Sequence, residues 1–159
     1  NSDNKCKIVW KNGFCGYLDS NDKMITEYKY EYAYPFSEGL AAVKLNEKWG
    51  YINSQGKVVI RTKYSYVESF LNGLALVKYN WKWGFINAME DIVVPIIYDA
   101  VYPFNDGLSK VLLNNKWGFI DKMGNEIIEL KYRHVESFSD GLALVLMDNN
   151  YFFIDKFIW

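Results

Sequence analysis

The chain has 159 residues, of which 50% are hydrophobic and 18% aromatic, enough to bury a substantial core in one domain. Its 18 basic and 19 acidic residues nearly balance, and no run of one sign occurs, which argues against nucleic acid or an electrostatically held membrane as a partner. No stretch approaches the roughly 18 apolar residues of a membrane-spanning helix, so we expect no membrane insertion.

The sequence starts at Asn1 without a methionine or a signal-like segment, as expected of an excised or processed piece of a longer protein. A first hairpin is predicted at Asn12-Gly13, the strongest two-residue turn signal, and its register places Cys15 opposite Trp10. Cys6 then lies four residues further along the ladder, roughly 13 Å away and too far for a disulfide. Two buried thiols are the favoured interpretation. Free thiols do not decide between a secreted or cell-envelope location and a cytoplasmic one.

One unit is copied along the chain. The tetrapeptide Lys-Trp-Gly-aromatic recurs every 34 residues, at 48–51, 82–85 and 116–119. A second marker, Gly-Leu-Ala or Gly-Leu-Ser, keeps the same period at 39–41, 73–75, 107–109 and 141–143. A period in this range predicts a tandem-repeat fold and lowers the odds of an enzyme.

The unit from Gly39 to Asn72 predicts two strands, 40–45 and 48–53, and a third at 57–60 after a short turn. The segment that follows has apolar residues at every third position, as Tyr64, Val67 and Phe70. That spacing fits neither a regular strand nor an α-helix, so we expect a bent connector or a short fourth strand. The hairpin tips share residues that tolerate a left-handed backbone: Asn12-Gly13, Asn46-Glu47, Asn80-Trp81, Asn114-Asn115 and Asp148-Asn149.

The predicted pairing gives each hairpin two apolar faces. Ala41, Val43, Gly50 and Ile52 share one face, and the tryptophan and the following aromatic residue share the other. Strands packed on both sides are therefore expected. The glycine after each tryptophan would let a neighbouring backbone approach closely. The predicted structural core of the repeats comprises Trp49, Gly50, Trp83, Gly84, Trp117 and Gly118.

The terminal copies deviate as the ends of a linear stack should. Cys15 takes the tryptophan position with Trp10 across from it, and Tyr151-Phe152 replaces Trp-Gly in the last copy. We predict one all-β domain over 1–159, an open solenoid-like array of stacked repeats, with a small β-propeller-like ring as the alternative. Its hairpins are expected at about 7–19, 41–53, 75–87, 109–121 and 143–155, with the terminal copies as atypical caps.

The string Phe-x-x-Gly-Leu-Ala-x-Val, then Lys-Trp-Gly-Phe-Ile-Asn, runs from Phe70 to Asn87 and continues through Val94-Pro95 to Tyr98. It resembles the WG repeat family, and the resemblance covers nearly the whole chain, from about Lys7 to Asp155. The resemblance implies a bacterial protein whose tandem all-β repeats serve as binding or scaffolding surfaces, without a common ligand or catalytic residue. The chain departs from the family pattern at Cys15, Phe152 and Glu90.

Enzyme, metal and cofactor chemistry find little support in the sequence. The single histidine, His134, aligns with Tyr32, Tyr66 and Ala100, as a partly exposed connector site would. Cys15 faces packing and has no nearby histidine. The recurring strand-end oxygens of Asp19, Asn53, Asn87, Asp121 and Asp155 suit turns better than calcium. We predict no catalytic residue, no metal and no cofactor.

Residues that break the repeat are the better functional candidates, because packing does not require them. Trp81 stands at a hairpin tip where the sister copies have Gly, Glu or Asn, although it could instead pack on its own hairpin. Tyrosines gather in the connectors, and the candidates for partner binding are Tyr32, Tyr34, Tyr66 and Tyr102. Tyr34-Pro35 and Tyr102-Pro103 alternate with Glu68-Ser69 and Glu136-Ser137, a period of 68 residues that duplication of a two-repeat block would also produce.

The sequence therefore predicts a non-catalytic module that binds another protein as an interaction or scaffolding surface. The alternative is a carbohydrate-binding module that recognises cell-wall or host glycans through surface aromatics.

Overall fold

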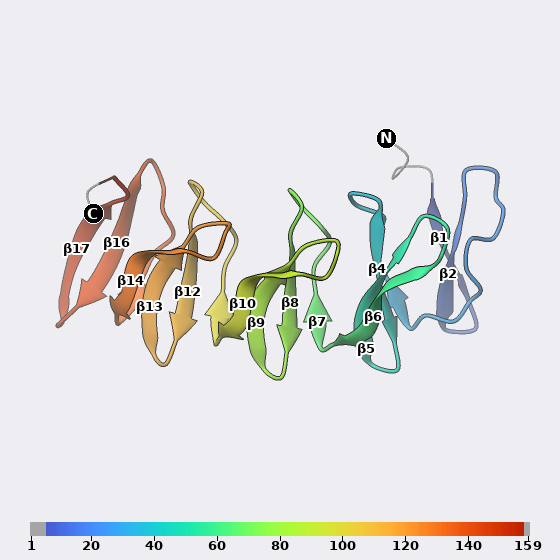
Figure 1. Ribbon diagram of the computed structural model, residues 1–159, viewed down its shortest axis with the longest axis horizontal. Helices are drawn as coiled ribbons and strands as arrows, with labels where there is room; N and C mark the ends of the chain where they lie inside the picture. Colours follow the sequence, from blue (N-terminus) through green and yellow to red (C-terminus); the bar gives the residue numbers. More distant parts are fainter. Residues whose placement is uncertain (1–5, 158–159) are drawn as a thin grey trace. The chain divides into compact units, whose positions relative to one another are not determined.

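The computed structural model describes residues 6–157, whose regular elements are all β-strands (Figure 1). The strands form five sheets, each of two to four strands and none closed into a barrel. They are β1 (Lys7–Lys11) with β2 (Phe14–Leu18); β3 (Tyr32–Ala33), β4 (Leu40–Leu45), β5 (Lys48–Asn53) and β6 (Val58–Tyr64); β7 (Tyr66–Val67), β8 (Ala75–Tyr79), β9 (Lys82–Ile86) and β10 (Ile92–Tyr98); β11 (Ala100–Val101), β12 (Ser109–Leu113), β13 (Lys116–Ile120) and β14 (Glu126–Tyr132); and β15 (His134–Val135), β16 (Leu142–Met147) and β17 (Asn150–Asp155).

The all-β class and the tandem repeats predicted from the sequence are confirmed. The chain divides into two compact units, one of residues up to 81 together with 85–92, the other of 82–84 together with 93 onward. Among the described residues, no helix is long and apolar enough to cross a membrane.

Each long hairpin turns at two residues with a left-handed backbone. Both tip residues have positive φ in all five copies, from Asn12 and Gly13 at 52° and 82° to Asp148 and Asn149 at 51° and 65°. Two successive positive φ values define the type I′ turn that suits the twist of paired strands. The predicted register is confirmed, with Trp10 opposite Cys15 and Lys44 opposite Trp49. Cys15 is buried and Cys6 half-buried, and both keep their thiols instead of forming a disulfide.

In the three repeats with an intact Trp-Gly pair, the third strand is longer than predicted and packs over the glycine of that pair. β6 runs on to Tyr64, so Trp49 pairs with Tyr64 while Tyr51 pairs with Ile60. Between these two pairs lie one residue on β5 and three residues on β6. The extra residues of the bulge lie over Gly50, where a Cβ atom would meet the backbone of Ile60–Thr62 at less than 3 Å. The same arrangement joins β13 to β14 over Gly118. Glycine is required at this position because the neighbouring backbone takes the space of a side chain.

The connector after each third strand contains a short strand, as the sequence allowed. β3 pairs with β4 and β7 with β8, so the connector of one repeat forms the edge of the next sheet. Phe70 of the connector places its ring edge-on against Tyr51, with the ring centres 4.9 Å apart, and the Tyr51 hydroxyl donates to the Glu68 carbonyl at 2.6 Å. The core aromatic residue of a hairpin is therefore covered by the connector that follows it.

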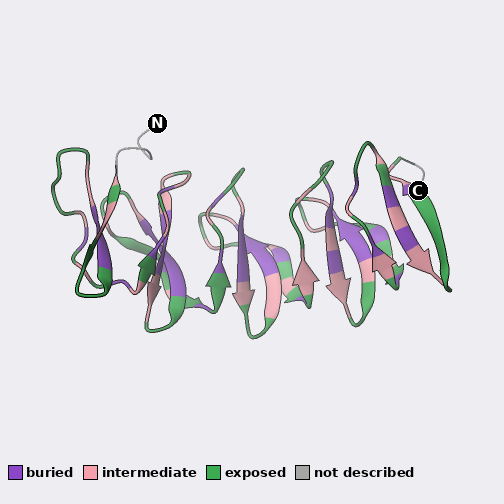
Figure 2. Ribbon diagram, turned by 180° about the vertical axis from the view of Figure 1, so that it is seen from behind, coloured by how far each residue is buried: buried purple, intermediate pink, exposed green. Residues whose placement is uncertain are grey.

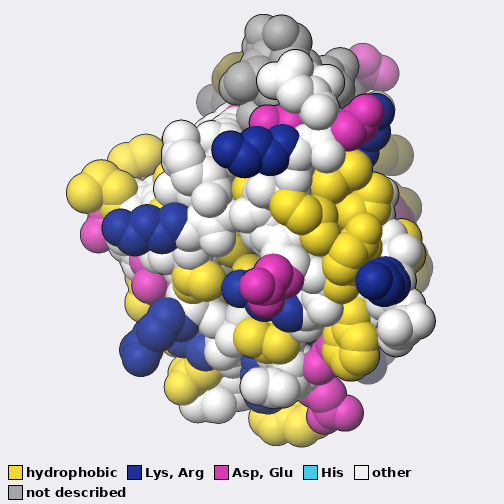
Figure 3. All heavy atoms as spheres, turned by 90° about the vertical axis from the view of Figure 1, so that its right-hand side faces the viewer, with side chains coloured by type: hydrophobic (Ala, Val, Ile, Leu, Met, Phe, Trp, Pro, Cys, Tyr) yellow, Lys and Arg dark blue, Asp and Glu magenta, His cyan; other side chains and the backbone are white. Residues whose placement is uncertain are grey.

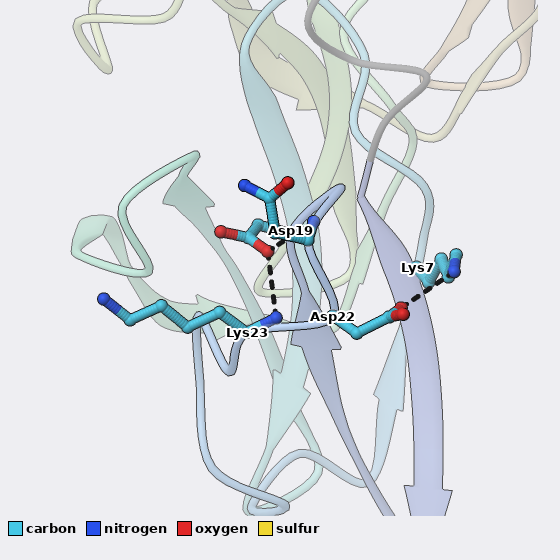
Figure 4. Close-up of polar contacts among 5 residues, drawn as sticks. Lys7, Asp19, Asp22 and Lys23 are labelled. Carbon is cyan, nitrogen blue, oxygen red and sulfur yellow. Dashed lines mark hydrogen bonds and ion pairs between the residues drawn. The ribbon is translucent and has the colours of Figure 1, made fainter.

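Short polar side chains hold the turns between the second and third strands. Asp19 Oδ1 accepts hydrogen bonds from the backbone N–H groups of Asn21 and Lys23 at 2.8 and 2.9 Å, while Asp22 pairs with Lys7 (Figure 4). Asn53 makes the same two bonds in the next copy. These oxygens act as turn formers, because they satisfy backbone donors that would otherwise lack partners.

Candidate functional site

Aromatic side chains, from exposed Tyr32 to buried Trp49, line a groove on the sheet of β3 to β6. The groove has a volume of about 310 Å³ and is lined by Glu31, Tyr32, Tyr34, Lys44 and Trp49. We call it the aromatic groove. Its members come together because Tyr32 pairs with Lys44 across β3 and β4, and Lys44 pairs with Trp49 across β4 and β5. Side chains directly opposite in neighbouring strands share one face of the sheet, so the three stand in a row.

The rings of the groove stand mostly edge-on to one another. Tyr32 meets Tyr34 and Trp49 at interplanar angles of 87° and 67°, with ring centres about 6 Å apart. Tyr34 is the exception, since it lies tilted by 35° over Trp49 with a ring separation of 4.9 Å. The resulting surface has walls and a floor, and it is not one flat aromatic plane. Edge-to-face pairs of this kind add attraction beyond the area they bury.

Trp10 of β1 extends the aromatic surface beyond the groove. Its ring lies edge-on to Tyr32, with the centres 6.0 Å apart, and 53% of the residue is exposed, against 50% for Tyr32. Figure 3 looks onto the β1–β2 end of the chain and shows hydrophobic side chains gathered in a column on that face. The exposed large hydrophobic residues of these two strands are Trp10 and Phe14. Exposed aromatic groups in contact with one another are a recognised mark of interaction surfaces.

Some of the polar groups around the groove already make hydrogen bonds within the protein. Both carboxylate oxygens of Glu31 accept the backbone N–H of Glu47 at the hairpin tip, at 3.2 and 3.0 Å. The Tyr34 carbonyl accepts the buried Tyr17 hydroxyl at 2.6 Å, which fixes this connector to the core. Burial, with neighbouring Tyr32 and Glu68, raises the pKa of Tyr34, so its hydroxyl stays protonated and able to donate a hydrogen bond near neutral pH.

The other predicted candidates fall at three further places. Tyr66 is exposed on β7 and is not among the residues that line the aromatic groove; burial, followed by Glu68 and Tyr34, raises its pKa. Trp81 is 84% exposed at its hairpin tip, where Lys78 Nζ lies 5.6 Å from the ring centre. Tyr102, in the second unit, packs on Trp117 at 5.8 Å, and Lys110 Nζ lies over both rings.

The predicted core residues differ in burial. Trp49 is buried, whereas Trp83 and Trp117 are half-buried, and the glycines that follow all three are buried. Trp49 therefore serves two surfaces, since its ring also forms the floor of the aromatic groove. The strict period of the tryptophans indicated packing and gave no sign of this second role.

The residues considered for catalysis lie apart from any cluster of reactive groups in the described part of the chain. His134 Nε2 lies 2.8 Å from Glu136 Oε1 at an exposed edge of β15. The Cys15 thiol is buried and donates to the Tyr30 carbonyl at 3.4 Å, and burial raises its pKa. Within residues 6–157 no group of three or more His, Cys, Asp or Glu side chains could hold a metal ion.

Sequence reasoning missed several members of this region. Trp10 was predicted only as the residue opposite Cys15 and Lys44 only as the residue opposite Trp49, and Glu31 was not named. Their signal was present in the register, because Tyr32, Lys44 and Trp49 occupy facing positions of three neighbouring strands. Finding it required the pairing of the connector strand, which a two-residue element does not reveal in a sequence.

The repeated hairpin, bulged third strand and connector define a tandem-repeat β-protein. The profile of the family described as "WG containing repeat" matches four successive segments, residues 16–49, 49–83, 83–117 and 117–151. The chain therefore belongs to the WG repeat family, as the resemblance of its sequence indicated. None of the curated proteins compared with the chain matches it.

Solved structures resemble the fold at low sequence identity. "KlHsv2 with loop 6CD replaced by a Gly-Ser linker", a β-propeller-like repeat protein, is 12% identical, with a TM-score of 0.51 over 98% of this chain and 60% of that one. A second structure, described as "The de novo evolutionary emergence of a symmetrical protein is shaped by folding constraints", is 9% identical, with a TM-score of 0.35 over 94% of this chain and 85% of that one. The chain thus spans about 60% of the length of the first structure, and the similarity concerns the repeated β-fold.

Proposed function

We propose that this WG repeat chain is a non-catalytic binding module, that its ligand is another protein, and that the aromatic groove is the recognition surface. The observation that carries the proposal is the contiguous set of Trp10, Tyr32, Tyr34 and Trp49, half of it solvent-exposed, around a groove of about 310 Å³. Tyrosine and tryptophan dominate the energetically important positions of protein interfaces, because they combine a large apolar area with a polar group.

The shape of the groove favours a protein side chain over a sugar ring. The ring of Tyr32 stands at 67–87° to its neighbours, so the exposed rings form walls and offer little continuous flat surface. A pocket between such walls suits an apolar side chain inserted from a partner, with Lys44 at its edge to meet a polar or acidic group. A glycan remains the alternative outcome of the test.

The non-catalytic part of the proposal is supported by the environment of the two most reactive side chains. Burial raises the pKa of the Cys15 thiol, and the thiolate is the reactive form of cysteine. The one histidine, His134, interacts with the exposed Glu136 on an edge strand, and neither lines the aromatic groove.

The test is a selection of displayed peptides against the chain, with the dissociation constant of each enriched peptide measured on two variants. Tyr32→Thr removes an exposed ring of the groove and keeps a residue suited to a strand. Leu71→Thr removes a similarly exposed apolar side chain away from the groove. We expect Tyr32→Thr to weaken binding by about tenfold or more and Leu71→Thr to leave it unchanged.

Two results would contradict the proposal. Equal affinity of both variants would remove the groove from the recognition surface. Glycan-array signals that Tyr32→Thr abolishes, together with no enriched peptide, would assign the groove to carbohydrate.

A further inference from the structure

The last hairpin has an outer edge that no other strand of the described chain covers. β17 pairs with β16 over the whole of Asn150–Asp155, and the described residues place no strand on its other side. In the preceding repeat the equivalent strand, β13, uses that side to pair with β14, where Trp117 and Phe119 each face a residue of β14. Tyr151 and Phe153 hold the same positions in β17, so their backbone N–H and C=O groups point toward the open edge.

A third strand like those of the other repeats cannot pack on β17, because Phe152 stands where they have glycine. A Cβ atom on Gly118 would lie 2.5 Å from the Ile128 carbonyl oxygen of β14. Phe152 carries a whole ring at this position, and the ring lies edge-on to Tyr132 with the centres 6.3 Å apart. The open edge therefore suits a regular strand, which leaves room for side chains, and it excludes the irregular strand that packs over the glycines.

β17 also lacks the features that protect other edge strands from pairing with a strand of another molecule. Those strands carry proline or charged residues, which disfavour such pairing. They are Lys7 and Lys11 in β1, Arg61 and Lys63 in β6, Pro95 in β10, and Glu129 and Lys131 in β14. Residues 150–154 of β17 include neither proline nor a charge. Tyr151 and Phe153 are instead 62% and 68% exposed, and Figure 2 shows β17 largely exposed.

We propose that β17 pairs with β17 of a second copy of this chain, as antiparallel neighbours related by a twofold axis that passes between the two Phe152 residues. A twofold axis perpendicular to the sheet brings identical residues face to face at its centre and keeps each face of the sheet continuous. Tyr151 of each copy then faces Phe153 of the other, and each such pair exchanges its N–H···O=C hydrogen bonds in both directions. The three-stranded sheets of the two copies join into one continuous sheet.

The charges that flank β17 favour this register. Asp148 and Lys156 lie equally far from Phe152 in the sequence, so Asp148 of each copy faces Lys156 of the other. Asp148 forms no ion pair within the described residues, and Lys156 Nζ lies 4.0 Å from Asp106 Oδ2, at the outer limit of an ion pair. Opposite charges across neighbouring strands stabilise a sheet. An axis at Phe153 would place Lys156 opposite Asn150, which has no charge.

The size of the apolar surface predicts a weak dimer. At roughly 200 Å² for a whole aromatic side chain, the exposed parts of Tyr151, Phe152 and Phe153 amount to about 300 Å² in each copy. Two copies contribute about 600 Å² of aromatic surface, less than the about 1,200 Å² of a stable complex, so we expect a dissociation constant on the order of 10–100 µM. None of these residues lines the aromatic groove, so the inference goes beyond the proposed function and does not depend on it.

The first experiment is analytical ultracentrifugation of the full chain from about 5 µM to about 500 µM, a range that brackets this dissociation constant. We expect the mass to rise from 18.6 kDa toward twice that value. Phe153→Lys adds a charge to the edge and removes the aromatic pair with Tyr151, so it should weaken association by about tenfold or more. Leu71→Lys is the matched control, since Leu71 is 71% exposed and lies outside β17, and it should associate as the unchanged chain does.

The second experiment tests the register by mild oxidation of cysteine variants. Phe152→Cys places two thiols at a facing pair, where the Cα separation of about 4.5 Å allows a disulfide. We expect a disulfide-linked dimer from Phe152→Cys, and little from Phe153→Cys or from the unchanged chain, whose Cys15 is buried and Cys6 half-buried. The proposal is overturned if the chain stays monomeric at the highest concentration, if Phe153→Lys and Leu71→Lys associate equally, or if Phe153→Cys cross-links as readily as Phe152→Cys.

Discussion

At the scale of single residues, Trp81 departs furthest from its sister positions. It has φ of 67° at a hairpin tip, and the other tips place Gly13, Glu47, Asn115 and Asn149 there. A bulky side chain in the left-handed region is strained, whereas asparagine and glycine adopt it readily. The ring is also 84% exposed, so it gains little from burial. Folding alone does not account for a tryptophan at this tip, which is why it remains a candidate contact with a partner.

Trp81→Asn is therefore expected to raise the free energy of unfolding by about 0.5–1 kcal/mol. The reverse change at the equivalent tip, Asn115→Trp, should lower it by a similar amount. Urea denaturation of both variants measures the two effects. A loss of stability in Trp81→Asn would show that the indole packs on its own hairpin more strongly than its contact with Lys78 implies.

Asp19 gives the protein a pH-dependent contribution at the turn after β2. The backbone N–H of Lys23, followed by that of Asn21, bonds its carboxylate and lowers its pKa below the ordinary 3.8. A carboxyl group with a lowered pKa in the folded state stabilises the fold above its unfolded pKa, and this contribution is lost as the pH falls through the folded value.

We expect Asp19→Asn to be less stable than the unchanged chain near neutral pH, with the difference disappearing as the pH drops below 3.8. Asparagine keeps the acceptor, as Asn53 does in the next repeat, but it does not titrate. Urea denaturation at neutral and acid pH measures the difference, and Asn53→Ala is the control whose loss should not depend on pH. A constant difference for Asp19→Asn would exclude the charge as its cause.

At the scale of elements, the bulge of the third strand decides which residue can follow the tryptophan. In β9 a Cβ atom on Gly84 would lie 2.6 Å from the Val94 carbonyl oxygen and 2.8 Å from the Ile96 Cα. These are backbone atoms of a paired strand, and they cannot move aside as the end of a flexible side chain can. Any larger residue must therefore separate the hairpin from its third strand.

Gly84→Ala is expected to lower the free energy of unfolding by about 3 kcal/mol or more, because the added methyl group overlaps backbone. Gly107→Ala is the matched control, since Gly107 has φ of 81° and open space around it. It should cost only the left-handed backbone penalty of about 1–2 kcal/mol. Equal losses in the two variants would show that backbone conformation, and not close approach, sets the requirement for glycine.

The sequence predicted elements well where one residue type controls the backbone, and less well where tertiary pairing does. The hairpin tips follow from Asn and Gly, whose tolerance of positive φ is a local property. The third strand was predicted to stop near Ile60 but continues to Tyr64. The bulge interrupts the alternation of faces in this strand, so the sequence there has neither the period of a strand nor that of a helix.

At the scale of the whole molecule, the predicted tyrosine surface and the observed aromatic groove contain different sets of residues. The sequence identified Tyr32, Tyr34 and Tyr66 as irregular residues, but the aromatic groove also needs Trp49, whose period indicated only packing.

Within a unit, the burial of a hairpin's aromatic residue depends on the segment that follows it. Phe119 is 0% exposed, because the connector ring of Phe138 lies 4.7 Å from it, in a core cluster with Ile128 of the third strand. Phe153 holds the same position in the last hairpin, yet it is 68% exposed, and Figure 2 shows β17 largely exposed. In the described part of the chain no third strand pairs with the outer edge of β17.

Phe119→Ala and Phe153→Ala compare one repeat position with and without that cover. We expect Phe119→Ala to lower the free energy of unfolding by about 3–5 kcal/mol, as for truncation of a core phenylalanine. Phe153→Ala should change it by no more than about 0.5 kcal/mol, because its ring is mostly in water already. Urea denaturation of the two variants measures both changes in the free energy of unfolding. Similar losses at both positions would mean that each hairpin buries its own aromatic residue, and that repeats do not depend on the connector that follows.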